Sequence, residues 1–110
     1  MTITEEEVLA TVRRVTVSRL KAWVGSGLVR PQSAGESVAY TEADVARLYL
    51  ICELSEDLEV SEEALPVVLS LIDQIHGLRR QLKMLGAAVE AQPGSVQDAI
   101  KEVFQDLSRE

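Results

Sequence analysis

The feature that most constrains the fold is a long heptad repeat in the second half of this 110-residue chain. Small or apolar residues recur there at alternating steps of four and three, at Ala64, Val68, Leu71, Ile75, Leu78, Leu82, Leu85 and Val89. This alternation is typical of a helix that packs a narrow apolar stripe against another helix. We expect the long helix to begin close to Pro66, because a proline deep inside a helix breaks its hydrogen-bond ladder. Pro93-Gly94 should end it.

A second apolar stripe follows Pro93-Gly94. Its residues repeat at steps of four, three and four, at Val96, Ile100, Val103 and Leu107, which predicts a last helix capped by Ser95. The two stripes either form an antiparallel hairpin within one chain, or each pairs with a second copy. Of the two, we expect a homodimer. The seam, whether of a dimer or of a hairpin, should consist of Leu71, Ile75, Leu78, Leu82, Leu85 and Val89.

The first half of the chain has clear helix-start signals. Thr4 and Thr41 each precede an acidic residue by three positions, the spacing of a capping box, and predict helices over 5–13 and 42–57. Thr16 can cap a helix between them, which Gly27 should end in the left-handed conformation. Residues 29–40, with a proline and a glycine, are typical of a β-ribbon.

These elements predict an all-α fold with a small β-ribbon wing, in one compact domain. A winged helix-turn-helix-like part should occupy residues 1–60, a long coiled-coil-like helix residues 61–92, and a C-terminal amphipathic helix residues 93–110. The helix over 42–57 is apolar nearly all round, which is typical of a helix that is buried or touches more than one neighbour.

Charge is distributed unevenly along this acidic chain, whose net charge is −7. Residues 1–50 are balanced, with six acidic and six basic side chains, whereas residues 51–92 hold eight acidic and three basic ones. The stretch "CELSEDLEVSEEA" contains six carboxylates and no cation. Such a segment favours a basic protein partner, since complementary charge speeds encounter and adds specificity.

No motif for catalysis, a cofactor or a metal stands out. His76 is the only histidine and Cys52 the only cysteine, so we expect no metal cluster and no internal disulfide. The "GSG" at residues 25–27 closes a helix, whereas phosphate-binding loops open one. No apolar run approaches the ~20 residues of a membrane span. We therefore expect a cytoplasmic, non-enzymatic protein without cofactors and without membrane contact.

The segments "VTVSRLKAWVGSGLV", "YTEADVARLYLICELSEDLEVS" and "EDLEVSEEALPVVLSLIDQIHGLRRQLKML" resemble known proteins. The order of helix, helix, wing and helix looks like a MerR-type winged helix-turn-helix. More closely, residues 3 to about 89 resemble the CbpM family, modulators of the DnaJ-like co-chaperone CbpA. The resemblance rests on an acidic-Leu pair, a proline that opens the long helix, and an "L-I-D-x-I-x-x-L" run. The tail after Gln92 looks like an extension of that core.

This resemblance implies a function and a site. CbpM-like proteins bind the J-domain of their co-chaperone, in competition with the DnaK-type chaperone, and also curb the co-chaperone's DNA binding. J-domains present a basic helix, so an acidic protein that covers it would inhibit without chemistry of its own. The residues implied in partner binding are Asp57 and Asp73, at acidic positions of the family pattern, with Glu53 and Glu56 beside them.

Two other functions remain open. A MerR-like transcription regulator would place Ser18, Arg19 and Lys21 in the major groove and Arg30 on the DNA backbone. DNA binding is the less favoured alternative, because most affinity for DNA comes from cationic side chains and the wing carries few of them. The third possibility is a structural adaptor whose heptads serve assembly alone.

Overall fold

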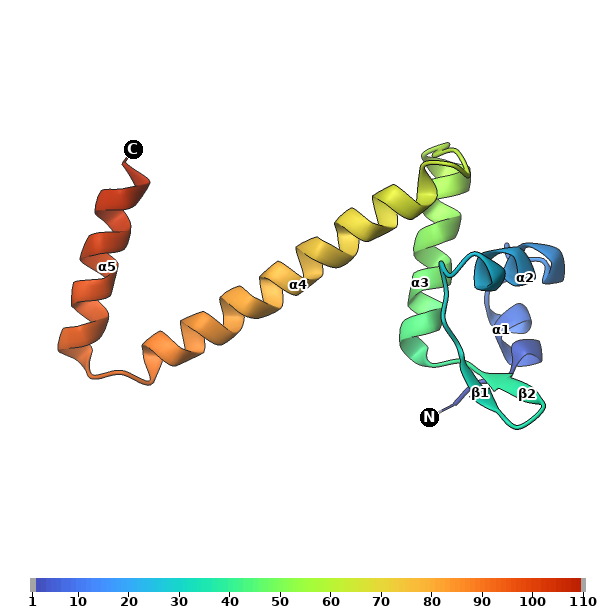
Figure 1. Ribbon diagram of the computed structural model, residues 1–110, viewed down its shortest axis with the longest axis horizontal. Coiled ribbons are helices and arrows are strands. Elements are labelled where there is room, and N and C mark those ends of the chain that lie inside the picture. The colour runs from blue at the N-terminus through green and yellow to red at the C-terminus, as the bar shows by residue number, and fades with distance from the viewer. Residues whose placement is uncertain (1, 110) are drawn as a thin grey trace. The chain divides into compact units, whose positions relative to one another are not determined.

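The structure is a computed structural model in which residues 2–109 are described. It is helical apart from one small sheet (Figure 1). The elements in chain order are α1 (Glu5–Thr11), α2 (Val17–Gly25), β1 (Gln32–Ala34), β2 (Ser37–Ala39), α3 (Glu42–Cys52), the π-helix η1 (Glu53–Asp57), α4 (Leu65–Glu90) and α5 (Gly94–Ser108). The predicted fold class, helices with a β-ribbon wing and a long helix, is confirmed.

The chain divides into two compact units, residues 1–70 and 71–110. The division falls within α4, whose first residues belong to the first unit. The boundaries that the sequence suggests, after residues 60 and 92, remain predictions.

The first two helices begin where their capping residues predict. The Thr4 hydroxyl accepts a hydrogen bond from the Glu7 backbone N–H at 3.2 Å, and Thr16 does the same for Arg19 at 3.2 Å. α1 ends at Thr11 rather than near residue 13, because Val12 leaves the helical region with φ −99° and ψ 83°. Gly27 adopts φ +80°, the left-handed conformation expected of it.

The wing is a two-stranded antiparallel sheet. Its register pairs Gln32 with Ala39, Ser33 with Val38 and Ala34 with Ser37, and Gly35 turns the chain with φ +68°. Beside it, Ile3 and Tyr40 exchange two backbone hydrogen bonds of 2.7 and 2.8 Å. This bridge ties the start of the chain to the end of the wing.

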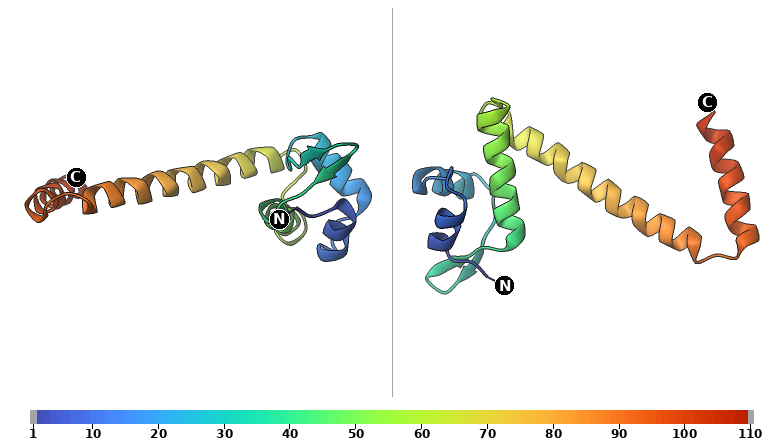
Figure 2. Two further views of the ribbon diagram at one scale, coloured as in Figure 1. Left: turned by 90° about the horizontal axis from the view of Figure 1, so that it is seen from below. Right: turned by 180° about the vertical axis from the view of Figure 1, so that it is seen from behind.

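The core of the first unit forms around α3. Helices α1 and α2 lie on the same side of α3 in both the front and the rear views (Figures 1 and 2). Apolar side chains from every helix of this unit are buried there: Val8, Val12, Val15, Leu20, Trp23, Leu28, Val29, Tyr40, Leu48, Ile51, Cys52, Leu54, Leu65 and Leu69. The nearly all-round apolar character of α3 thus reflects a central helix, which leaves Tyr49 and, beyond α3, Leu58 exposed.

Two differences from the sequence prediction concern helix ends. The helix predicted over 42–57 is α-helical only to Cys52 and continues as η1, where the Leu58 N–H reaches the Glu53 carbonyl at 3.0 Å. At the other end, α5 begins at Gly94, with Pro93 as its N-cap and without a side-chain cap. Ser95 therefore lies within the helix. The Pro93 carbonyl accepts from the N–H groups of Val96 and Gln97, each at 3.0 Å, and so begins the helix.

The second unit consists of two helical segments, the rest of α4 and α5. The Gln97 side-chain amide donates to the carbonyls of Glu90 at 3.1 Å and Gln92 at 2.8 Å, which fastens the turn between them. Apart from the half-buried Val89, the predicted seam residues are exposed within a single copy of the chain.

Candidate functional site

A cluster of ion pairs joins the helix-turn-helix to the acidic segment. Arg14, in the turn between α1 and α2, forms three hydrogen bonds of 3.1 to 3.2 Å with both carboxylate oxygens of Asp57. Its Nε atom lies 3.2 Å from an oxygen of Glu56. The guanidinium therefore binds Asp57 in the bidentate geometry in which arginine interacts most strongly, and it contacts Glu56 through Nε.

Arg19, in the first turns of α2, completes the cluster. Its guanidinium pairs with the other oxygen of Glu56 and donates to the Ser55 hydroxyl at 3.2 Å. It also donates to the Arg14 carbonyl at 3.2 Å and lies 4.8 Å from the ring centre of Trp23. These contacts fix the side chain that the DNA-binding hypothesis would place in the major groove.

The π-helix presents the acidic side of this cluster. Ser55, Glu56 and Asp57 all lie in η1, where the wider turn shifts side chains from the positions of a regular α-helix. The sequence shows no cation within residues 52–64, yet Arg14 and Arg19 reach this segment from 37 to 43 residues away. Glu56 and Asp57 are thus ion-paired rather than simply solvated.

The cluster perturbs the acidity of one carboxyl. The hydrogen bond from Arg19 is the main cause that holds the pKa of Glu56 below its ordinary value. Desolvation raises this pKa by less than that bond lowers it, and the charges of Arg14 and Arg19 lower it further. A lowered pKa in the folded state means that the ionised form stabilises the fold. This contribution is present above the ordinary carboxyl pKa of about 4.3 and is lost as the pH falls through the lower folded value.

We therefore expect Glu56→Gln to lower stability at neutral pH and to have less effect in acid. The difference in unfolding free energy between the wild type and Glu56→Gln should narrow progressively below about pH 4.3. Urea unfolding between pH 3 and pH 7, followed by the fluorescence of the single tryptophan, measures it. A difference that stays constant over this range would contradict the ion pairing of Glu56.

The rest of the acidic segment keeps its charge free. Glu53, Glu59, Glu62 and Glu63 are exposed, and within residues 2–109 none of them forms an ion pair. We call these four residues, with Glu56 and Asp57, the acidic hairpin. Two cations against six carboxylates leave it strongly negative.

Asp73 does not belong to the same compact unit as the acidic hairpin. It is on α4 in the second unit, where Arg79, Arg80, Lys83 and His76 line the same shallow hollow. Its own stretch of helix is thus more basic than acidic. The structure brings Glu53, Glu56 and Asp57 together in one unit, and Asp73 belongs to the other.

The residues of the DNA-binding hypothesis are only partly available. Ser18, Lys21 and Arg30 are exposed, whereas Arg19 is held in the ion cluster. The wing itself contributes no cation between Gln32 and Ala39. Of the three cations in this set, Lys21 and Arg30 form no ion pair within residues 2–109.

A hollow beside the wing is negatively charged. It lies between the start of α1 and the wing, and its lining includes the carboxylates of Glu5, Glu6 and Glu36. In winged DNA-binding domains the wing approaches the phosphate backbone, and carboxylates there repel it. A phosphate backbone at this hollow would therefore meet three carboxylates.

Sequence reasoning missed Arg14 and Ser55 as members of the site. Their partners lie about 40 residues away in the chain, and only the packing of α3 against α1 and α2 brings them together. The sequence signals for this site were limited to the pair Arg13-Arg14 and the excess of acidic residues over 53–63.

Among residues 2–109, no group of three or more histidine, cysteine, aspartate or glutamate side chains is arranged to bind a metal ion. No helix in this part of the chain has the length and hydropathy to span a membrane. Burial raises the pKa of the Cys52 thiol, which keeps it protonated and poorly nucleophilic.

Comparison with known proteins identifies the family. The sequence profile described as MerR HTH family regulatory protein matches residues 3–86, most of the chain. No curated protein and no solved structure matches the chain. The profile covers the helix-turn-helix, the wing, α3 and most of α4, and it stops before α5. The chain therefore belongs to the MerR family of helix-turn-helix regulatory proteins.

Proposed function

We propose that this MerR-family protein regulates a chaperone system by binding the J-domain of a DnaJ- or CbpA-like co-chaperone. The observation that carries the proposal is the ion cluster of Arg14 and Arg19 with Glu56 and Asp57. It withdraws two cations from the helix-turn-helix, where DNA binding would need them. The resemblance to CbpM-like proteins supplies the class of partner.

The acidic hairpin is the surface proposed for the partner. Its unpaired carboxylates, Glu53, Glu59, Glu62 and Glu63, complement the basic helix that a J-domain presents. Glu56 and Asp57 can contribute if cations of the partner replace Arg14 and Arg19, which are themselves partly exposed. Inhibition would follow from occupancy alone, since the DnaK-type chaperone needs the same basic helix.

An exposed apolar residue lies within this acidic surface. Leu58 follows Asp57 directly, and 68% of its surface is accessible. Most stable interfaces combine a desolvated apolar centre with a polar rim. Leu58 is an apolar side chain with a carboxylate residue on either side in the sequence, Asp57 and Glu59.

DNA binding is the second candidate, because the matched family is a helix-turn-helix family. Under it, exposed Ser18 and Lys21 would approach bases and Arg30 the phosphates. Asp57 and Glu56 would then act as internal competitors of the phosphate backbone for Arg14 and Arg19.

Binding measurements with both partners separate the two functions. Titrations of the full chain with a J-domain and with duplex DNA, each at about 50 and 200 mM salt, should give J-domain binding and at most weak DNA binding. A protein with many phosphate contacts loses about 10³–10⁵ in DNA affinity over this range. Steeply salt-dependent DNA binding without J-domain affinity would overturn the proposal.

Charge reversal then tests the surface. Glu53→Lys with Glu62→Lys should weaken J-domain binding about tenfold or more, because it reverses charge without removing a partner of Arg14 or Arg19. The matched control is Glu6→Lys with Glu42→Lys, which changes the net charge equally at exposed positions away from the hairpin. Equal effects of the two variants would mean that only net charge matters. Asp73→Lys, measured alone, tests the position implied by the family resemblance.

A further inference from the structure

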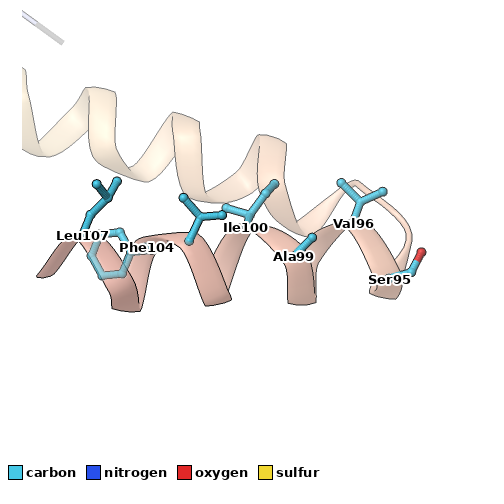
Figure 3. A pocket seen from close by; sticks show the side chains of 7 residues that line it. Ser95, Val96, Ala99, Ile100, Phe104 and Leu107 are labelled. Carbon is cyan, nitrogen blue, oxygen red and sulfur yellow. The ribbon is translucent and has the colours of Figure 1, made fainter. Parts of the chain in front are cut away.

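Two apolar faces of the second unit are left exposed within one copy of the chain. On α4 they belong to the heptad seam, and on α5 to a face where Val103, Phe104 and Leu107 are more than half accessible. Figure 3 shows Val96, Ile100, Phe104 and Leu107 along one side of α5. Contiguous apolar surface of this kind is uncommon on monomers and marks an interface.

The helices α4 and α5 of one chain share only part of this surface. Ile100 and Phe104 line a groove together with Leu82, Leu85 and Val89 of α4. The wider apolar face of α5 is lined by residues of α5 alone. The groove is open, with a volume of about 570 Å³, so it has room for side chains of another helix.

The charges beside the two stripes are of opposite sign. On α4, Arg79 and Lys83 each directly follow a seam residue, Leu78 and Leu82, so they lie on one flank of the stripe. The other flank holds the residues that directly precede seam positions. Between residues 70 and 88, none of these residues is charged. Glu90, which follows Val89 at the end of α4, is acidic, so the following flank of the α4 stripe is basic over residues 79–83.

On α5 the pattern is reversed. Glu102 and Asp106 directly precede the stripe residues Val103 and Leu107, so the preceding flank is acidic. Asp106 also lies 3.8 Å from Arg109, an exposed and weak pair. The following flank of α5 carries Lys101 as its charged residue.

The flanks decide the direction in which two such helices can pair. Consider two helices that pack with their apolar stripes facing each other. If they run parallel, the flank of residues that follow the stripe on one helix meets the flank of residues that precede it on the other. In an antiparallel pair, like flanks meet, so that Arg79 and Lys83 would face the side of α5 that carries Lys101. The α4–α5 turn within one chain spans only residues 91–93 and makes a lengthwise pair antiparallel. Within one chain, Glu90 and Lys101 line the same groove with opposite charges, but Arg79 and Lys83 meet no acidic residue on the facing flank of α5. Charge complementarity at Arg79 and Lys83 therefore favours the α5 of another copy.

We propose that α5 packs in parallel on α4 of a second copy of this chain, and that the second α5 returns the contact. The two-fold symmetric arrangement pairs Arg79 and Lys83 of each copy with Glu102 and Asp106 of the other, and covers both apolar stripes. It also makes the two α4 helices antiparallel, as in a four-helix bundle. Since the matched profile ends at residue 86, α5 adds a dimer-locking element that lies outside the profile.

The test uses two charge-reversed variants of the full chain. One carries Arg79→Glu with Lys83→Glu, and the other Glu102→Lys with Asp106→Lys. Each alone should raise the dimer dissociation constant about 10-fold to 100-fold, because every inter-chain pair becomes a like-charge contact. In an equimolar mixture, each acidic α4 meets a basic α5 and each basic α4 meets an acidic α5, so dimers should return at wild-type strength. Sedimentation equilibrium and native mass spectrometry measure the masses.

Alternative arrangements give different outcomes. If α5 covers α4 of its own chain, the wild type is monomeric, or the mixture fails to restore the dimer, and the proposal is overturned. If only the α4 helices pair, reversal on α5 leaves the mass unchanged, which also overturns it. Circular dichroism of each variant serves as the folding control, and all substituted residues are exposed in the single chain. The inference is independent of the J-domain proposal, because its test involves no other protein.

Discussion

Leu48→Ala should lower the unfolding free energy of the unit formed by residues 1–70 by about 3 kcal/mol, within the 2–5 kcal/mol typical of buried leucines. Leu48 lies in the middle of α3 and has no accessible surface. Truncation would leave a cavity at the centre of the core, because α1 and α2 pack on the same helix. A domain of this size has only several kcal/mol of stability, so the loss should be large in proportion.

Trp23 makes the measurement simple. It is the only tryptophan and is buried in the same unit, so urea unfolding followed by its fluorescence reports on this core. Leu58→Ala is the matched control, with the same chemical change at a site that is 68% accessible, and should cost below about 0.5 kcal/mol. Similar losses from both variants would show that α3 is not the centre of the core.

Leu78→Lys with Leu82→Lys should abolish self-association. Both residues belong to the heptad seam and are 60% and 67% accessible in one copy, so lysine is tolerated by the single chain. In a dimer the two ammonium groups of each copy would be buried without a partner, which is strongly unfavourable. We expect the dissociation constant to rise more than about 100-fold, with helix content unchanged.

The control places a lysine elsewhere on α4. Ala87→Lys alters an exposed position that neither belongs to the seam nor adjoins a seam residue, and should leave the mass unchanged. Sedimentation equilibrium over a wide concentration range, with thermal melting in parallel, measures both effects. If the double seam variant changes neither mass nor melting temperature, the heptad stripe is not an interface of any kind.

Much of the fold follows from local sequence signals. Thr4, Thr16 and Thr41 cap the helices that they were expected to cap, and Gly27 and Gly35 adopt positive φ where the chain turns. Such signals are reliable because capping and left-handed backbone depend on a few neighbouring residues. The long helix was equally clear from its heptad spacing.

The helix ends were less predictable. The change from α3 to η1 has no signature in residues 42–57, and the capping role expected of Ser95 was wrong because Pro93 precedes the helix. Either end depends on small differences between competing hydrogen bonds. Sequence pattern fixes these only to within a residue or two.

The candidate site depended on tertiary structure to a greater degree. The excess of acid over residues 51–63 is a property of the sequence, as are the resemblance to MerR-type proteins and the apolar stripes of the last two helices. The sequence does not show which of these carboxylates remain without an ion pair. Asp57 and Glu56 look no different from Glu59 and Glu62 in the sequence, yet only the first pair is held by arginines.

The sequence by itself therefore determined the elements, the family and the overall sign of the charge, because these arise from spacing and composition. Tertiary structure alone decided which charges are neutralised, since ion pairs form across 37 to 43 residues once α1, α2 and α3 share a core. By bringing Arg14 and Arg19 to η1, that packing pairs two cations of the helix-turn-helix with carboxylates of the same chain.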